Sequence, residues 1–159
     1  MDASSLAPIR YGRIILGVLA LGLTVLAVVA GALGPVSEMH DAQMDGMLLL
    51  VLGLLALGEI PAYAIVRASM RARLQSEHEG QTPTEERVRS LAQAFLVTTL
   101  IPAAMLEGWG LFGGIIYLIT GQWTALLAPI IAIIGIVLLL PSHDKFNRFV
   151  SDITGQHWP

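Results

Sequence analysis

The sequence predicts an all-α integral membrane protein with four transmembrane helices. Only 13% of the 159 residues are charged and 55% are hydrophobic, whereas a soluble domain has about 25% charged residues. The apolar residues gather in four long runs, which cover Ile14–Leu33, Met47–Val66, Ser90–Thr120 and Trp123–Leu140. A helix of about 20 apolar residues crosses the core of a bilayer, so each run is long enough to span. Helices are the expected spanning form because lipid offers no partners to backbone groups.

Residues that stop or start helices lie at the ends of these runs. Gly34-Pro35 follows the first run and Pro141 follows the fourth. The segment Thr82-Pro83-Thr84-Glu85 has the pattern of a capping box with proline at the first helical position, so the third helix should begin well before the membrane. We therefore expect one domain, residues 1–159, with spans near 14–33, 47–66, 94–120 and 123–140.

The first run has a second interpretation, as a signal peptide. Ala30-Gly31-Ala32 resembles a small-residue cleavage site. The apolar run, however, is longer than the roughly 7–15 residues of a usual signal-peptide core. We therefore expect the first run to remain as a transmembrane helix.

Every lysine and arginine falls on one side of a four-span arrangement. The nine residues are Arg10, Arg13, Arg67, Arg71, Arg73, Arg87, Arg89, Lys145 and Arg148. The loop between the first two runs is instead acidic, with Glu38, Asp41 and Asp45. Because basic residues collect on the cytoplasmic side, both termini, the loop 67–89 and the tail 142–159 are expected in the cytoplasm. The expected location is the cell (inner) membrane.

The tail should form a short amphipathic helix with Ser142 as its cap. Its apolar residues recur at helical spacing, at Phe146, Phe149, Val150 and Ile153. Such a helix either lies flat on the lipid surface or packs under the cytoplasmic loop, and the pattern fits both arrangements.

Small residues recur at spacings of three and four in the apolar runs. Gly17 and Gly31 belong to such a stripe in the first run, and Gly110 and Gly114 belong to one in the third. Small stripes let helices approach closely in lipid. The stripes therefore predict helix packing, either within one bundle or, for the first run, between copies in a homo-oligomer.

Two glutamates inside apolar runs are the candidates for chemistry. Glu107 lies close to the middle of its run, and Glu59 lies slightly to the cytoplasmic side of the middle of its own. A charged carboxylate at that depth costs a few kcal/mol, and no run contains a lysine or arginine. Each acid is therefore expected to be protonated, paired or bound to a cation. A purely structural role, in which each holds helices together as a hydrogen-bonded acid, is the alternative.

Proline lies near both acids. Pro61 leaves the Leu57 carbonyl without its helical donor, and Pro102 does the same to the Thr98 carbonyl. These carbonyls and the hydroxyls of Thr98 and Thr99 are either cation ligands or a local adjustment to kinks.

Several kinds of site are not expected. The chain has no cysteine, so thiolate metal sites and disulfides are excluded. The acidic loop around His40 matches no metal-ligand spacing, and no histidine lies at membrane depth to hold haem. No metal and no cofactor are therefore expected. No nucleophile–base pair and no phosphate loop are present, so we expect no enzyme. The arginine clusters at 67–73 and 87–89 are explained by membrane orientation, so we expect no nucleic-acid partner.

The third run also carries a local family resemblance. It contains Ala104-Met105-Leu106-Glu107 with Gly113 six positions after the acid, and the basic segment 67–89 precedes it. In this pattern residues 89–114 resemble the carboxylate helix of the proteolipid c subunits of rotary ATP synthases. The resemblance implies that Glu107 is a carboxyl that binds a proton or a sodium ion.

The sequence thus leads to two hypotheses about function. The first is a small multi-pass protein, acting as an oligomer, that handles protons or small cations through Glu107 with Glu59 as its partner. The second is a non-catalytic accessory or scaffold subunit of a larger membrane complex. A small-molecule transporter is less favoured because four short helices enclose little space.

Overall fold

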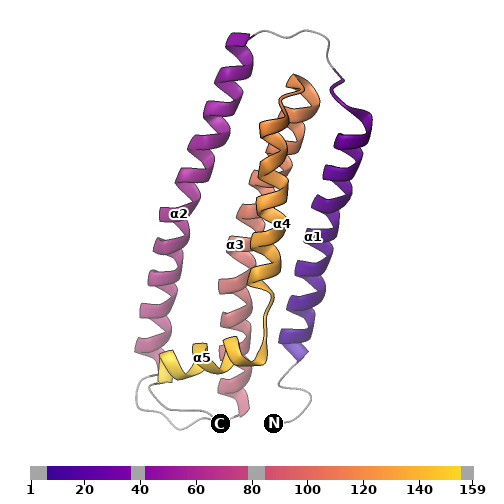
Figure 1. Cartoon of the computed structure of the whole chain (residues 1–159). Helices are drawn as coiled ribbons and strands as arrows, with labels where there is room; N and C mark the ends of the chain where they lie inside the picture. Colours follow the sequence, from indigo (N-terminus) through magenta and orange to yellow (C-terminus); the bar gives the residue numbers. More distant parts are fainter. Residues whose placement is uncertain (1–6, 37–41, 79–84, 155–159) are drawn as a thin grey trace.

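The computed structural model describes residues 7–36, 42–78 and 85–154, and all regular structure within these ranges is helical (Figure 1). The elements are α1 (Ala7–Leu33), α2 (Ala42–His78), α3 (Glu85–Thr120), the short 3-10 helix η1 (Trp123–Leu126), α4 (Leu127–Leu139) and α5 (His143–Thr154). Helices α1 to α4 run alongside one another, and α5 crosses one end of the bundle. The predicted all-helical fold class is confirmed.

Three segments are long and apolar enough to cross a membrane, namely Ala7–Leu33, Gln43–Leu74 and Val88–Thr120. The segment Trp123–Leu139 becomes a fourth only when it is counted together with α5, from which it is bent by 70°. Trp123–Leu139 itself runs beside α3 (Figure 1). The described helices thus fit a protein with three or four membrane spans. The predicted number, four, is reached only when Trp123–Leu139 and α5 count as one span.

Helix α2 extends further into the expected cytoplasmic loop than predicted, whereas α3 begins before the predicted span 94–120, as expected. Helix α2 continues through Arg67 to His78, and α3 begins at Glu85. Residues 67–78 are rich in Arg, Ala, Met and Leu, which are strong helix formers. Most of the predicted loop 67–89 is therefore helical. The predicted cap residues 82–84 lie outside the described residues, and α3 begins directly after them.

The two ends of the bundle differ in charge. The start of α1, the end of α2, the start of α3 and all of α5 lie together (Figure 1). All nine lysines and arginines lie at this end, which we call the basic end. At the opposite end, Gly34 and Gly121 follow α1 and α3, each with a φ of 69° that favours glycine. Gly34 thus ends the first helix as the sequence predicts.

Helix α3 lies at the centre and contributes to three separate core clusters. The cluster at the basic end includes Leu91 and Phe95, the middle cluster includes Ala103, and the cluster at the opposite end includes Ile116. Helix α2 adds Leu74 to the first and Leu52 to the third, but no buried residue to the middle cluster. None of the described side chains between them, in residues 53–73, is buried. We call residues 53–73 the stand-off segment of α2.

The tail helix α5 buries its apolar face against protein. Phe146, Val150 and Ile153 are buried in the cluster at the basic end, together with Ile9, Leu74 and Leu91. Ser142 caps α5, because its Oγ accepts the Lys145 backbone N–H at 3.3 Å. Of the two arrangements open from the sequence, the structure has the packed one, although the partners are the helix ends rather than the loop.

The predicted packing glycines fall into two groups. A Cβ added to Gly110 would lie 2.8 Å from the Ala132 Cβ, and one added to Gly114 would lie 2.8 Å from Leu26 Cδ2. Gly17 and Gly31 would meet nothing within 4 Å, and both are exposed. Gly110 and Gly114 thus let α3 approach its neighbours. Packing at Gly17 and Gly31 stays a prediction, and it requires a second chain.

Candidate functional site

Glu59 lies on the face of α2 that is turned toward the bundle. This face is a row of buried or half-buried residues at spacings of three and four, namely Asp45, Leu49, Leu52, Ala56, Glu59, Tyr63, Val66, Met70 and Leu74. Residues spaced in this way share one side of a helix. The Glu59 side chain therefore projects from the stand-off segment toward α3.

A groove between α2 and α3 has Glu59 in its wall. Four α2 residues, Val51, Leu54, Leu55 and Gly58, and Met105 of α3 form the rest of the lining. Glu59 is the only ionisable residue among them. The groove exists because α2 packs closely at Leu52 but not along the segment that follows. A half-buried carboxyl thus faces an otherwise apolar groove.

Glu107 lies on a different side of α3. It shares a face with Gly110 and Gly114, where an added Cβ would meet Leu23 or Leu26 of α1 and, at Gly110, also Ala132 of α4. Met105, which lines the groove of Glu59, is two residues earlier and points about 200° away around the helix. The structure therefore does not bring Glu59 and Glu107 together. Glu107 is half-buried on the side of α3 nearest to α1.

Neither carboxyl makes a hydrogen bond or an ion pair within the part of the chain that the structure describes. All basic residues lie at the basic end, and the Trp109 indole N–H is used elsewhere, donating to the Leu52 carbonyl at 3.0 Å. The structural alternative requires hydrogen-bonded acids that hold helices together. The described contacts of Glu59 and Glu107 offer it no support.

The two prolines lie inside continuous helices, Pro61 in α2 and Pro102 in α3. The hydroxyls of Thr98 and Thr99 both donate to the Phe95 carbonyl, each at 2.8 Å. These hydrogen bonds lie within one helix. The two threonine hydroxyls are therefore used inside α3, near Pro102, and bind neither glutamate.

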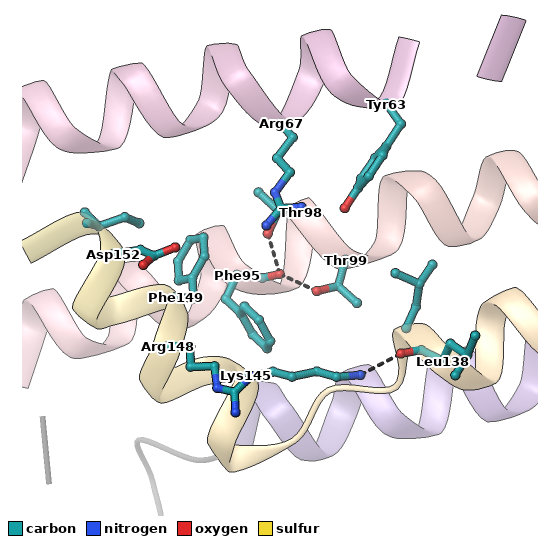
Figure 2. A pocket seen from close by; sticks show the side chains of 12 residues that line it. Tyr63, Arg67, Phe95, Thr98, Thr99, Leu138, Lys145, Arg148, Phe149 and Asp152 are labelled. Carbon is teal, nitrogen blue, oxygen red and sulfur yellow. Dashed lines mark hydrogen bonds between the residues drawn. The ribbon is translucent and has the colours of Figure 1, made fainter. Parts of the chain in front are cut away.

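Polar side chains follow Glu59 along α2 toward the basic end. Tyr63 and Arg67 follow Glu59 at intervals of four residues, so all three share one side of α2. Figure 2 shows Tyr63 and Arg67 directed toward Thr98 and Thr99 of α3. The tyrosine was not singled out from the sequence. The signal was available in the i, i+4, i+8 spacing of Glu59, Tyr63 and Arg67.

Polar contacts also join the helix ends at the opposite end of the bundle, where the Val36 backbone N–H donates to the Leu118 carbonyl at 2.8 Å. Gln122 Nε2 donates to the Asp45 carboxylate at 3.5 Å, which links the turn after α3 to the start of α2. His40 lies outside the described residues. In the described ranges no group of three or more His, Asp or Glu is placed to hold a metal ion.

Comparison with protein-family models, with curated proteins and with solved structures finds no match for this chain.

Proposed function

We propose that the chain is a multi-pass protein of the cell membrane that takes up and releases protons, or a small cation, at Glu59 and Glu107. The observation that carries the proposal is that both carboxyls lie at the depth of the apolar band and have no partner in the described chain. A carboxylate in this environment is stabilised by a bound proton or cation. Reversible binding is therefore the chemistry that the two residues can perform.

The geometry supports Glu59 as the group that exchanges protons with the basic end. It faces the groove along the stand-off segment, and Tyr63 and Arg67 continue the polar row from it. Along α2, Arg67 is eight residues beyond Glu59, which corresponds to about 12 Å. A short row of polar side chains of this kind gives protons or water a route into the apolar band. Glu107, on the other side of α3, forms a separate site that faces α1.

The proposed orientation places the basic end in the cytoplasm, which follows the usual bias of lysine and arginine. Glu59 would then exchange protons with the cytoplasmic side. The resemblance of residues 89–114 to the proteolipid c subunits concerns Glu107 and stays part of this proposal.

Proton flux into liposomes that contain the purified protein tests the proposal. With an imposed membrane potential and a pH-sensitive dye inside, the wild-type protein should acidify or alkalinise the lumen. Glu59→Gln should abolish this flux, because the amide keeps the shape of the protonated acid but cannot release a proton. Glu107→Gln should reduce the flux, and the matched control Asp144→Asn, an exposed acid of α5, should not.

A sodium gradient without a pH gradient distinguishes a cation from a proton in the same vesicles. Protection of Glu59 and Glu107 from a hydrophobic carbodiimide by sodium would identify the cation. Full wild-type flux of both ions in the Glu59→Gln, Glu107→Gln double variant would refute ion handling.

An accessory role in a larger complex is the second candidate function. Helix α2 makes its main contacts with α3 and α5 only, and apolar residues such as Leu57 and Ile60 are exposed on it. A partner chain could cover this surface. The native mass of the detergent-extracted complex separates a hetero-complex from a homo-oligomer.

A further inference from the structure

A pocket of about 350 Å³ lies at the basic end, between α2, α3, α4 and α5 (Figure 2). Helix α5 closes it on one side, and the stand-off segment of α2 borders it on another. The apolar part of the wall comes from Phe95, Leu138, Leu139, Phe149 and Ile153. The polar part contains the ends of Tyr63 and Arg67, which point into the pocket from α2.

The charge of the lining is mainly positive. Arg67, Lys145 and Arg148 are basic, and Asp152 is the one acidic residue of the lining. Asp152 already makes an interaction of its own, whereas the described part of the chain provides no hydrogen-bond or ion-pair partner for the Arg67 guanidinium. A guanidinium in this position recognises carboxylate or phosphate oxygens, which it can bind in a bidentate manner.

Lys145 is held in place at the pocket by α4. Its Nζ donates to the Leu138 carbonyl at 2.6 Å and to the Leu140 carbonyl at 2.9 Å. These carbonyls lie at the end of α4, where the last carbonyls of a helix have no backbone N–H partner within the helix. An ammonium group has three hydrogens, so one remains for a ligand. The Tyr63 hydroxyl adds a neutral donor on the other side.

The depth of the pocket matches the headgroup level of a bilayer. Arg67 follows Asp45, which lies at the opposite end, by 22 residues of one helix, or about 33 Å. The hydrocarbon core is about 30 Å thick. Arg67 therefore lies where the apolar core gives way to headgroups. The pocket is bordered on the lipid side by Leu138, which is 70% exposed.

We propose that this pocket binds the headgroup of an anionic phospholipid, with the phosphate on Arg67 and the Tyr63 hydroxyl, while Lys145 adds positive charge on the opposite wall. The apolar wall at Leu138 and Leu139 would contact the upper part of the acyl chains. Basic pockets between helices at this depth suit such headgroups. Free inorganic phosphate offers the same oxygens, but it makes no use of the apolar wall.

The test compares the purified protein in nanodiscs of phosphatidylcholine alone and in nanodiscs that also contain phosphatidylglycerol. Native mass spectrometry measures retained phosphatidylglycerol per chain. The wild-type protein should retain it, and Arg67→Gln should retain about tenfold less, because a charge-assisted hydrogen bond is lost. Arg89→Gln removes the same charge at the same end, outside the pocket, and should retain the wild-type amount.

Tyr63→Phe provides a second variant that removes only one hydroxyl and should also lower retention. Equal retention by Arg67→Gln, Tyr63→Phe and Arg89→Gln would overturn the proposal, since the lipid would then bind the general positive surface. A third arm adds inorganic phosphate to phosphatidylcholine nanodiscs. Thermal stabilisation by phosphate that equals the effect of phosphatidylglycerol would also overturn it, in favour of free phosphate. Circular dichroism of each variant in phosphatidylcholine reports whether it folds.

Discussion

At the scale of single residues, two helical glycines lie in opposite environments, Gly113 in a close contact and Gly17 in open space. A Cβ on Gly113 would contact the Ala128 Cβ and lie 2.8 Å from the Ala125 backbone oxygen. Gly17 has open space around it. The spacing of small residues predicts packing at Gly17 and does not single out Gly113. It cannot tell which stripe faces a neighbouring helix, because both sides of these helices are apolar.

We expect Gly113→Ala to destabilise the protein by about 1–3 kcal/mol, since the backbone oxygen of Ala125 cannot move away cheaply. The same change at Gly17 should stabilise the helix by about 0.5–1 kcal/mol, because alanine costs less entropy there. Thermal unfolding in detergent measures both. Equal effects at the two positions would contradict the packing described here. A loss of stability in the Gly17→Ala variant that appears only in an oligomer would instead indicate that α1 joins two copies of the chain.

Trp109 joins α3 to α2 through its hydrogen bond to the Leu52 carbonyl. We expect Trp109→Phe to cost about 0.6 kcal/mol, the average for a side-chain hydrogen bond between membrane helices. Trp123→Phe is the matched control, because Trp123 is 70% exposed. Denaturant titration compares them, and an identical stability for the two variants would mean that the bond does not stabilise α2.

At the scale of elements, α5 ties the basic end of the bundle together. Phe146 is 1% exposed, and its ring meets Phe95 edge-on with centroids 5.6 Å apart. Arg13 of α1 holds the corner before α5, because its Nε donates to the Pro141 carbonyl at 2.7 Å. The tail is thus an integral part of the fold and also forms one wall of the pocket.

We expect Phe146→Ala to destabilise the protein by about 3–5 kcal/mol, the usual cost of removing a buried phenylalanine ring. His143→Ala changes an exposed residue of the same helix and should have little effect. Limited proteolysis should cleave the Phe146→Ala variant within 143–154 and leave the control intact. Resistance of both to cleavage would show that other contacts hold α5 in place.

At the scale of the whole molecule, the fold gathers all nine lysines and arginines of the sequence at one end of the bundle. The helices could be predicted, and so could the ends marked by Gly34, Pro141 and Ser142, which are strong local signals. The continuation of α2 to His78 was not predicted, because no such signal marks that end. The rotation of each helix about its axis could not. Helices α2 and α3 have apolar residues on every side, so nothing local indicates that Glu59 faces Met105 while Glu107 faces α1. The pocket was also beyond prediction, since four helices contribute to it.

Orientation is testable because the chain has no cysteine. We expect a membrane-impermeant maleimide to label Thr124→Cys, an exposed position at the end opposite the basic residues, in intact cells. Ser76→Cys, exposed near the end of α2, should be labelled only after permeabilisation. External labelling of Ser76→Cys would mean that the basic end faces outward.

The contact between Arg13 and Pro141 spans 128 residues of sequence. A ribosome that adds about 5–20 residues per second needs on the order of ten seconds to produce the acceptor after the donor has been made. Helix α3 is complete only at Thr120 and α4 only at Leu139, so for most of this interval α1 lacks the two helices that bury its inner face. In the proposed membrane arrangement, the first helix is therefore retained in the bilayer by its own apolarity. A chain halted by a premature stop codon before α3 would present α1 without the helices that bury its inner face.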